Sequence, residues 1–77
     1  MLHGMTPEQC RAARGWLAWS QTDLAREAHV GLSTVKDYEA RKRTPIQNNL
    51  DAMRRALEAA GIKFEENSIG GPLLGQG

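Results

Sequence analysis

Residues 27–45, EAHVGLSTVKDYEARKRTP, contain a helical pattern, an abrupt break, a second helical pattern and three consecutive basic residues. The break falls at residues 29–31, where the helical spacing of apolar side chains stops and Gly31 offers a permissive backbone position. Helical spacing returns over residues 32–40, with Val35 and Tyr38 on the inward side. Two short helices joined by so tight a break decide the fold of this chain.

Two N-terminal capping signatures begin the helices that precede the break. Residues 6–9, TPEQ, place threonine at the N-cap, proline at the first helical position and glutamine where it completes a capping box. They predict a helix that ends near Leu17. Residues 20–23, SQTD, place serine at the cap with an acid three residues on, and predict a second helix that ends near Ala28.

A fourth helix is predicted after the basic residues. Pro45 bars an immediate helix, and the helical spacing of apolar residues then covers about residues 48–60, before Gly61. Residues 62–66, IKFEE, alternate apolar and polar side chains and predict a short strand, which must pair, pack or fray. The glycine-rich residues 68–77 are typical of a mobile tail.

These elements predict an all-α fold, a compact four-helix domain over residues 6–61. A tail at residues 1–5 precedes the domain, and a short strand with a flexible glycine-rich tail follows it at residues 62–77. A chain of 77 residues holds one domain at most, with a small core and a modest net stability.

Composition argues against several classes of function. Cys10 is the one cysteine and the two histidines lie far apart, so we expect neither an intrachain disulfide nor a metal site. Without a phosphate-cradling glycine loop or a paired nucleophile and base, we expect neither a cofactor nor an enzyme. Without a secretion leader or a membrane-spanning apolar run, we expect a soluble cytoplasmic protein with no membrane partner. The net charge of +1 alone gives no argument for nucleic acid.

Two charged residues lie on predicted inward faces. Arg14 follows Cys10 by four residues and precedes Leu17 by three, on the apolar side of the first helix. Glu39 shares the inward side of residues 32–40. Each charge needs a partner, unless the helix registers differ and both side chains lie at the surface.

The outward side of residues 32–40 carries the hydrogen-bonding side chains of Ser33, Lys36 and Asp37. Two short helices with a glycine-containing break form the helix-turn-helix arrangement, in which the second helix can enter the major groove of DNA. These side chains suit base edges, although the same residues also suit an ordinary solvated helix face.

Residues 19–45 resemble the Cro and lambda-repressor-type helix-turn-helix family, also called the XRE family, and the resemblance covers residues 5–60. Its most specific elements are SQxxLA at residues 20–25, STVxDYE at residues 33–39 and RAAR at residues 11–14. The resemblance implies a lambda-repressor-like fold that binds double-stranded DNA, with an ion pair between Arg14 and Glu39. The implied base contacts are Leu32, Ser33, Lys36 and Asp37, and the implied phosphate contacts are Gln21, Arg41, Lys42 and Arg43.

Three residues depart from the family pattern. His29 and Arg41 replace glycines, so we expect each to adopt a left-handed conformation at some cost unless the turn is shaped differently. Gly31 stands where a serine often caps the next helix. At the base-reading positions, Leu32 can contact a thymine methyl group but cannot read a hydrogen-bonding edge, and Asp37 can accept from cytosine while its charge opposes nearby phosphates.

The leading functional hypothesis is a sequence-specific DNA-binding regulator that acts as a homodimer on half-sites about 34 Å apart. Pairing of residues 62–66 with a second copy would bury Phe64 and satisfy the strand edge. The alternative is a protein-interaction module, such as the antitoxin of a toxin–antitoxin pair, whose tail folds on a partner. That tail offers Ile69, Leu73 and Leu74 as apolar anchors, and its other interpretation is a plain frayed terminus.

Overall fold

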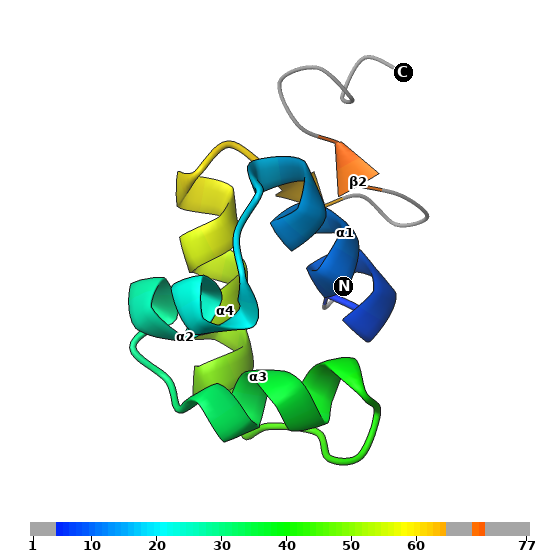
Figure 1. The fold of residues 1–77 in the computed structure, drawn as a ribbon, viewed down its shortest axis with the longest axis vertical. Coiled ribbons are helices and arrows are strands. Elements are labelled where there is room, and N and C mark those ends of the chain that lie inside the picture. The colour runs from blue at the N-terminus through cyan, green and yellow to red at the C-terminus, as the bar shows by residue number, and fades with distance from the viewer. Residues whose placement is uncertain (1–4, 65–68, 71–77) are drawn as a thin grey trace.

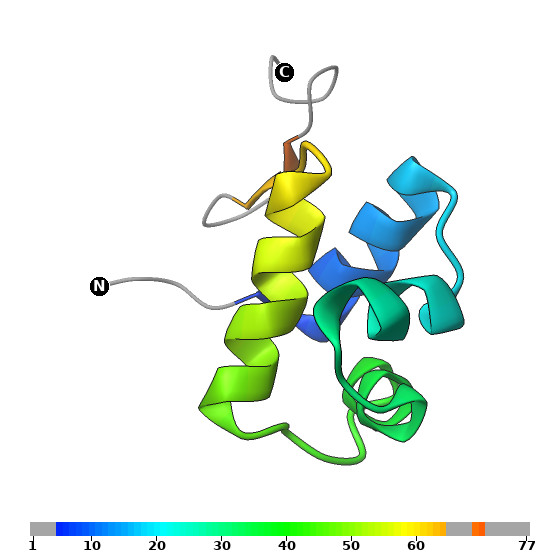
Figure 2. The ribbon, with the colours of Figure 1, turned by 90° about the vertical axis from the view of Figure 1, so that its left-hand side faces the viewer.

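The computed structural model describes residues 5–64 and 69–70, which form four helices and one antiparallel pair of short strands (Figure 1). α3 crosses the end of the molecule at which α4 begins, and the strand pair lies toward the other end, beside α1 (Figures 1 and 2). The all-α prediction is confirmed. In chain order the elements are α1 (Pro7–Leu17), α2 (Gln21–Ala28), α3 (Leu32–Glu39), α4 (Gln47–Ala59), β1 (Lys63–Phe64) and β2 (Ile69–Gly70).

Reciprocal capping boxes begin α1 and α2 as the sequence predicts. The Thr6 hydroxyl accepts from the Gln9 amide at 3.0 Å, and the Gln9 side chain accepts from the Thr6 amide at 2.9 Å. Ser20 and Asp23 repeat the arrangement, with both hydrogen bonds at 2.9 Å. Because these bonds satisfy amides that a helix start leaves unpaired, they fix where the two helices begin.

The turn between α2 and α3 agrees with the sequence prediction at His29 and differs from it at Gly31. Gly31 has a φ of −70° and a ψ of 149°, an extended conformation open to any residue, so the expectation that it supplies the permissive position is wrong. His29 has a φ of 59°, so the expectation that it adopts the left-handed conformation is confirmed. The end of α2 requires a left-handed residue at this position, because the backbone there turns so that the next amide can hydrogen-bond to a carbonyl of the last helical turn. The Val30 amide donates to the Ala25 carbonyl at 3.0 Å.

Two further residues, one after α1 and one after α3, have the left-handed conformation. Ala18 has a φ of 59° and Arg41 a φ of 60°, so the left-handed expectation for Arg41 is confirmed. The conformation is unfavourable for residues with a Cβ atom. Three non-glycine residues among the described ranges therefore hold strained backbone, and all three lie just after a helix.

One core joins all four helices. The deepest contributions from α2, α3 and α4 are Leu24, Val35, Met53 and Leu57, each fully buried, and Ile62 closes the core at 2% exposure. The buried Tyr38 hydroxyl donates to the Met5 carbonyl at 2.5 Å and ties the segment before α1 to α3. The remaining buried residues are Met5, Cys10, Ala13, Ala25, Ala28, Tyr38 and Glu39.

The predicted strand finds a partner within the chain. β1 pairs with β2 in antiparallel register, Lys63 opposite Gly70 and Phe64 opposite Ile69. The half-buried Phe64 packs against the core, and the Arg54 guanidinium lies 5.6 Å from the centre of its ring. The strand therefore does not need a second copy to pair or to cover Phe64. The predicted strand residues 65 and 66 and the anchors Leu73 and Leu74 lie outside the described residues.

Candidate nucleic-acid interface

The Glu39 carboxylate at the end of α3 is the point at which α1, α2 and α3 meet. Arg14 donates from Nε to Oε2 and from Nη2 to Oε1, both at 2.7 Å. Gln21 donates from Nε2 to Oε1 at 3.0 Å, and the Cys10 thiol donates to Oε2 at 3.1 Å. The side chain of Glu39 is 3% exposed and that of Arg14 is 17% exposed, so the two charges placed on apolar faces by the sequence form one buried ion pair.

The ionisation of this cluster follows from its geometry. Burial alone would raise the pKa of Glu39, but hydrogen bonds from Arg14, Cys10 and Gln21 outweigh it and hold that pKa below its ordinary value. Burial, with the Glu39 carboxylate close by, raises the pKa of the Cys10 thiol strongly. A buried carboxylate stays charged here because all of its neighbours donate to it.

A second arginine of α1 holds the backbone at the end of α3. Arg11 donates from Nη1 to the Glu39 carbonyl at 2.7 Å, while Arg14 also donates from Nη1 to the Trp19 carbonyl at 2.9 Å. Sequence reasoning missed the roles of Arg11 and Cys10. The available signal was their spacing, since Arg11 lies three residues before Arg14 and so shares its side of the helix. Together these contacts fix the orientation of α3 relative to α1.

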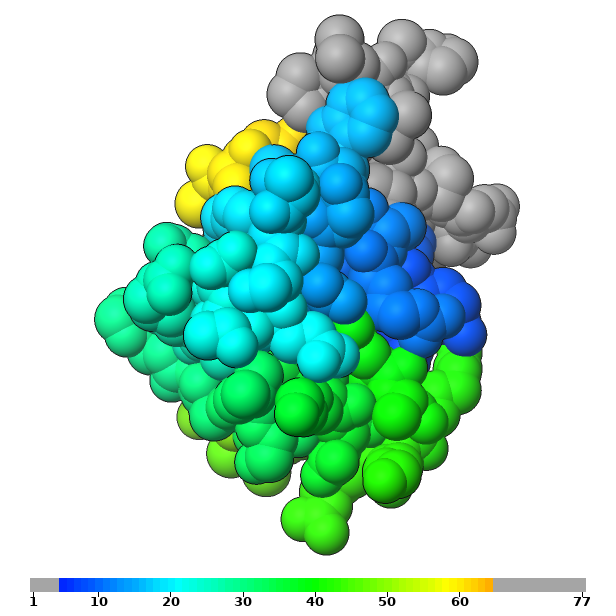
Figure 3. Space-filling model, viewed as in Figure 1, coloured from blue at the N-terminus to red at the C-terminus, as the bar shows by residue number. Residues whose placement is uncertain are grey.

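The opposite side of α3 faces solvent. Leu32, Ser33 and Lys36 are exposed, and Asp37 is half-buried. In the space-filling view, α3 and the residues after it form a protruding end of the molecule (Figure 3). The structure thus brings all four residues predicted to contact bases onto one outer face, with Asp37 set back from the other three.

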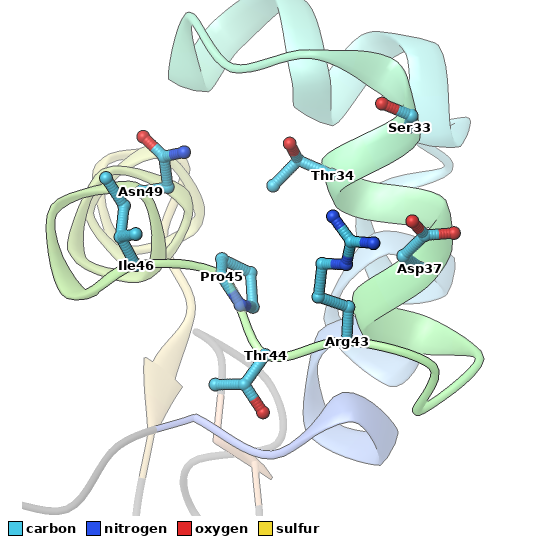
Figure 4. A pocket seen from close by; sticks show the side chains of 8 residues that line it. All are labelled: Ser33, Thr34, Asp37, Arg43, Thr44, Pro45, Ile46 and Asn49. Carbon is cyan, nitrogen blue, oxygen red and sulfur yellow. The ribbon is translucent and has the colours of Figure 1, made fainter.

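A pocket with a volume of about 230 Å³ lies between α3, the loop after it and the start of α4 (Figure 4). The Arg43 side chain extends across it toward α3, near Thr34 and Asp37. The loop is held to α3 because the Asp37 carbonyl accepts from the amides of Lys42, at 2.8 Å, and Arg43, at 3.4 Å. The pocket residues that the sequence did not predict as site residues are Thr34, Thr44, Pro45, Ile46 and Asn49.

The predicted phosphate contacts fall into three situations. Lys42 and Arg43 are exposed and form no ion pair within the part of the chain that the structure describes. Arg41 is paired with Glu8, its Nη2 lying 2.6 Å from Oε1 and its Nε 3.0 Å from Oε2. Gln21 is half-buried and directed at Glu39. The three basic residues are therefore not equivalent.

Two further classes of site do not occur among the described residues. No group of three or more histidine, cysteine, aspartate or glutamate residues within 5–64 and 69–70 could hold a metal ion. None of the helices there combines the length and the apolar character needed to cross a membrane.

Two short helices, braced by a third through a buried ion pair and presenting the outer face of the second, define a helix-turn-helix DNA-binding domain. The family model described as "Helix-turn-helix" matches residues 11–62, and the chain belongs to this XRE-type family. The resemblance stated from the sequence is confirmed.

The chain is also similar to proteins named multiprotein-bridging factor 1. It is 40% identical over 65 residues to that of Schizosaccharomyces pombe, covering 84% of this chain and 40% of the relative. It is 43% identical over 54 residues to that of Saccharomyces cerevisiae, covering 70% of this chain and 34% of the relative. The matched region therefore spans two fifths or less of the length of either relative.

Proposed function

We propose that this chain is a sequence-specific DNA-binding module of a transcriptional regulator, with α3 in the major groove. The proposal rests on one observation: α3 has an exposed polar face, and a loop with cationic side chains lies next to it. The Asp37 carbonyl of α3 holds that loop in place. A DNA-binding module works where DNA is, which places the protein inside the cell. The proposed partner of the module is double-stranded DNA, and the proposed role is regulatory rather than enzymatic.

Base reading follows from the chemistry of the α3 face. The Lys36 ammonium can donate to O6 and N7 of guanine, and the Ser33 hydroxyl can donate or accept at either kind of pair. Leu32 offers an apolar contact for the methyl group of thymine, and the Asp37 carboxylate accepts from the amino group of cytosine. The protein would thus recognise a mixed sequence through hydrogen bonds and one apolar contact.

Phosphate contacts position the module without reading sequence. Lys42 and Arg43, exposed beside α3, are the residues best placed for this role. Gln21 can add a contact, because its amide nitrogen carries two hydrogens and the bond to Glu39 uses one of them. The Glu39 cluster would then connect a phosphate contact directly to the orientation of α3.

We propose further that two copies act together on neighbouring half-sites, as helix-turn-helix proteins commonly do. Because β1 already pairs with β2, the copies would join through an outer edge of this strand pair rather than through an unpaired strand. Sedimentation without DNA tests this arrangement: a dimer at high micromolar concentration supports it, and a monomer there contradicts it.

The alternative candidate is a protein-interaction module, and the name of the relatives favours it. Multiprotein-bridging factors are, by that name, proteins that bridge other proteins. In this candidate the helix-turn-helix serves as a docking unit for a protein partner. The antitoxin form of the same idea rests on residues 68–77, of which the structure describes only the β2 backbone.

A competition titration separates the two candidates. Fluorescence anisotropy of labelled DNA fragments is followed as protein is added, at several salt concentrations and with random competitor DNA. If the module binds DNA specifically, binding should survive the competitor. The logarithm of the association constant should then fall by about 0.9 per log unit of salt for each phosphate neutralised. Weak binding that competitor removes would overturn the DNA-binding proposal in favour of the interaction module.

A further inference from the structure

Glu8 and Arg41 form a two-point ion pair between the first turn of α1 and the loop after α3. Both side chains are exposed, Arg41 at 61% and Glu8 at 55%, so the pair lies at the surface. Hydrogen bonding from Arg41 lowers the pKa of Glu8, and the carboxylate is charged at neutral pH. The left-handed conformation of Arg41 sets the direction of the loop at this residue.

The atoms that Arg41 uses are those that a phosphate would need. Nε and Nη2 form the edge of the guanidinium that matches two oxygens of a carboxylate or of a phosphate. Lys42 and Arg43, the next two residues, have no such carboxylate partner in the described part of the chain. Glu8 therefore withholds one of three consecutive cations from an incoming anion.

We infer that Glu8 is an intramolecular competitor of DNA phosphate for Arg41 and so limits both the affinity and the salt dependence of DNA binding. The inference rests on the proposed function, because it needs DNA as the competing anion. It assigns Glu8, a residue outside the helix-turn-helix, a role in setting how strongly the basic loop holds DNA.

The strength of the pair suits such competition. Exposed ion pairs are weak because water screens them, so a phosphate can displace Glu8. Releasing Arg41 in advance should tighten DNA binding about two- to fivefold, the range that corresponds to a surface pair. It should also steepen the salt slope by up to about 0.9, the full amount applying where Arg41 stays on Glu8 in the wild-type complex and contacts no phosphate.

The test measures binding of a short mixed-sequence DNA duplex at a series of salt concentrations, because phosphate contacts do not depend on sequence. The proteins are wild type, Glu8→Gln, Arg41→Gln and the double variant. The matched control is Glu58→Gln, which removes the same charge from the ion pair between Glu58 and Arg54 near the end of α4, away from α3. Lys42→Gln reports on the proposed function itself, and thermal unfolding checks that each variant is folded.

The expected result is tighter binding and a steeper salt slope for Glu8→Gln, no comparable gain for Glu58→Gln, and loss of the gain when Arg41→Gln is added. An equal gain for Glu8→Gln with and without Arg41, or an equal gain for Glu58→Gln, would overturn the inference while leaving DNA binding intact. If wild type shows no salt-dependent binding and Lys42→Gln changes nothing, the proposed function fails and the inference fails with it.

Discussion

Arg14 donates hydrogen bonds of 2.7 Å to both carboxylate oxygens of Glu39, and this pair joins α1 to the end of α3. The pair fixes the helix whose outer face is proposed to contact DNA. Gln21, Cys10 and Arg11 add donors from α1 and α2 to the same residue, so Glu39 connects the end of α3 to both of these helices.

The Arg14→Met variant should lose about 3 kcal/mol of unfolding free energy, because Glu39 keeps its burial and loses its cationic partner. Arg26→Met is the control, since Arg26 pairs with Asp23 at the surface and its loss should cost less than about 1 kcal/mol. Urea denaturation measures both values. Equal losses would show that the buried pair contributes no more than an exposed one.

Acid should weaken the fold through Glu39. Its pKa is lower in the folded protein than in the unfolded chain, so the stability it contributes is fully present above the unfolded pKa of about 4.3 and is lost as pH falls through the folded pKa. We expect a falling urea midpoint below about pH 5 and a shallower fall in Glu39→Gln. The pKa values of Glu8 and Asp23 are also lowered, so these residues add the same acid sensitivity to wild type and to Glu39→Gln. Identical pH profiles for the two proteins would exclude Glu39 as a source of acid sensitivity.

Glycine is more useful at residue 29 than at residue 31. His29→Gly removes the strain of a left-handed conformation and should raise the unfolding free energy by about 0.5–1 kcal/mol. Gly31→Ser should be stabilising by about 0.5 kcal/mol, since φ is −70° and serine can cap α3. Thermal denaturation compares them. Destabilisation by Gly31→Ser would mean that the turn does rely on a glycine there.

Cys10 should resist alkylation while the protein is folded. Its side chain is fully buried and its thiol pKa is raised, so little reactive thiolate is available. Iodoacetamide labelling, followed by mass spectrometry, should become fast in urea and should be faster for Arg14→Met than for wild type. Rapid labelling of the folded wild type would show that the Glu39 cluster opens readily.

The fold could be predicted largely from local patterns. Capping residues and apolar spacing act over a few positions, and they place the ends of α1, α2 and α3 within about one residue of those observed. At the turn, the resemblance correctly implied a left-handed His29, whereas the glycine at residue 31 was misleading. The left-handed position follows from the hydrogen bond that the amide of Val30 makes back to α2, not from the presence of glycine in the sequence.

Contacts between distant segments could not be read from spacing alone. Glu8 and Arg41 are 33 residues apart, as are Met5 and Tyr38, and nothing in either local sequence marks the partner. The pairing of β1 with β2 was missed for a related reason. The glycine-rich segment that contains β2 has no alternating strand pattern. Its pairing depends on where β1 lies after the end of α4.

Whether α3 reads DNA sequence can be decided by selection from a random pool of duplexes with wild type and with Lys36→Ala. Lys36 is exposed on the outer face of α3 and takes no part in the Glu39 cluster, so its replacement should leave the fold intact. We expect wild type to enrich a defined sequence and Lys36→Ala to relax the preference at one position, at a cost of about 1–3 kcal/mol for the original site. Failure of wild type to enrich any sequence, or an unchanged preference in Lys36→Ala, would contradict sequence reading by α3.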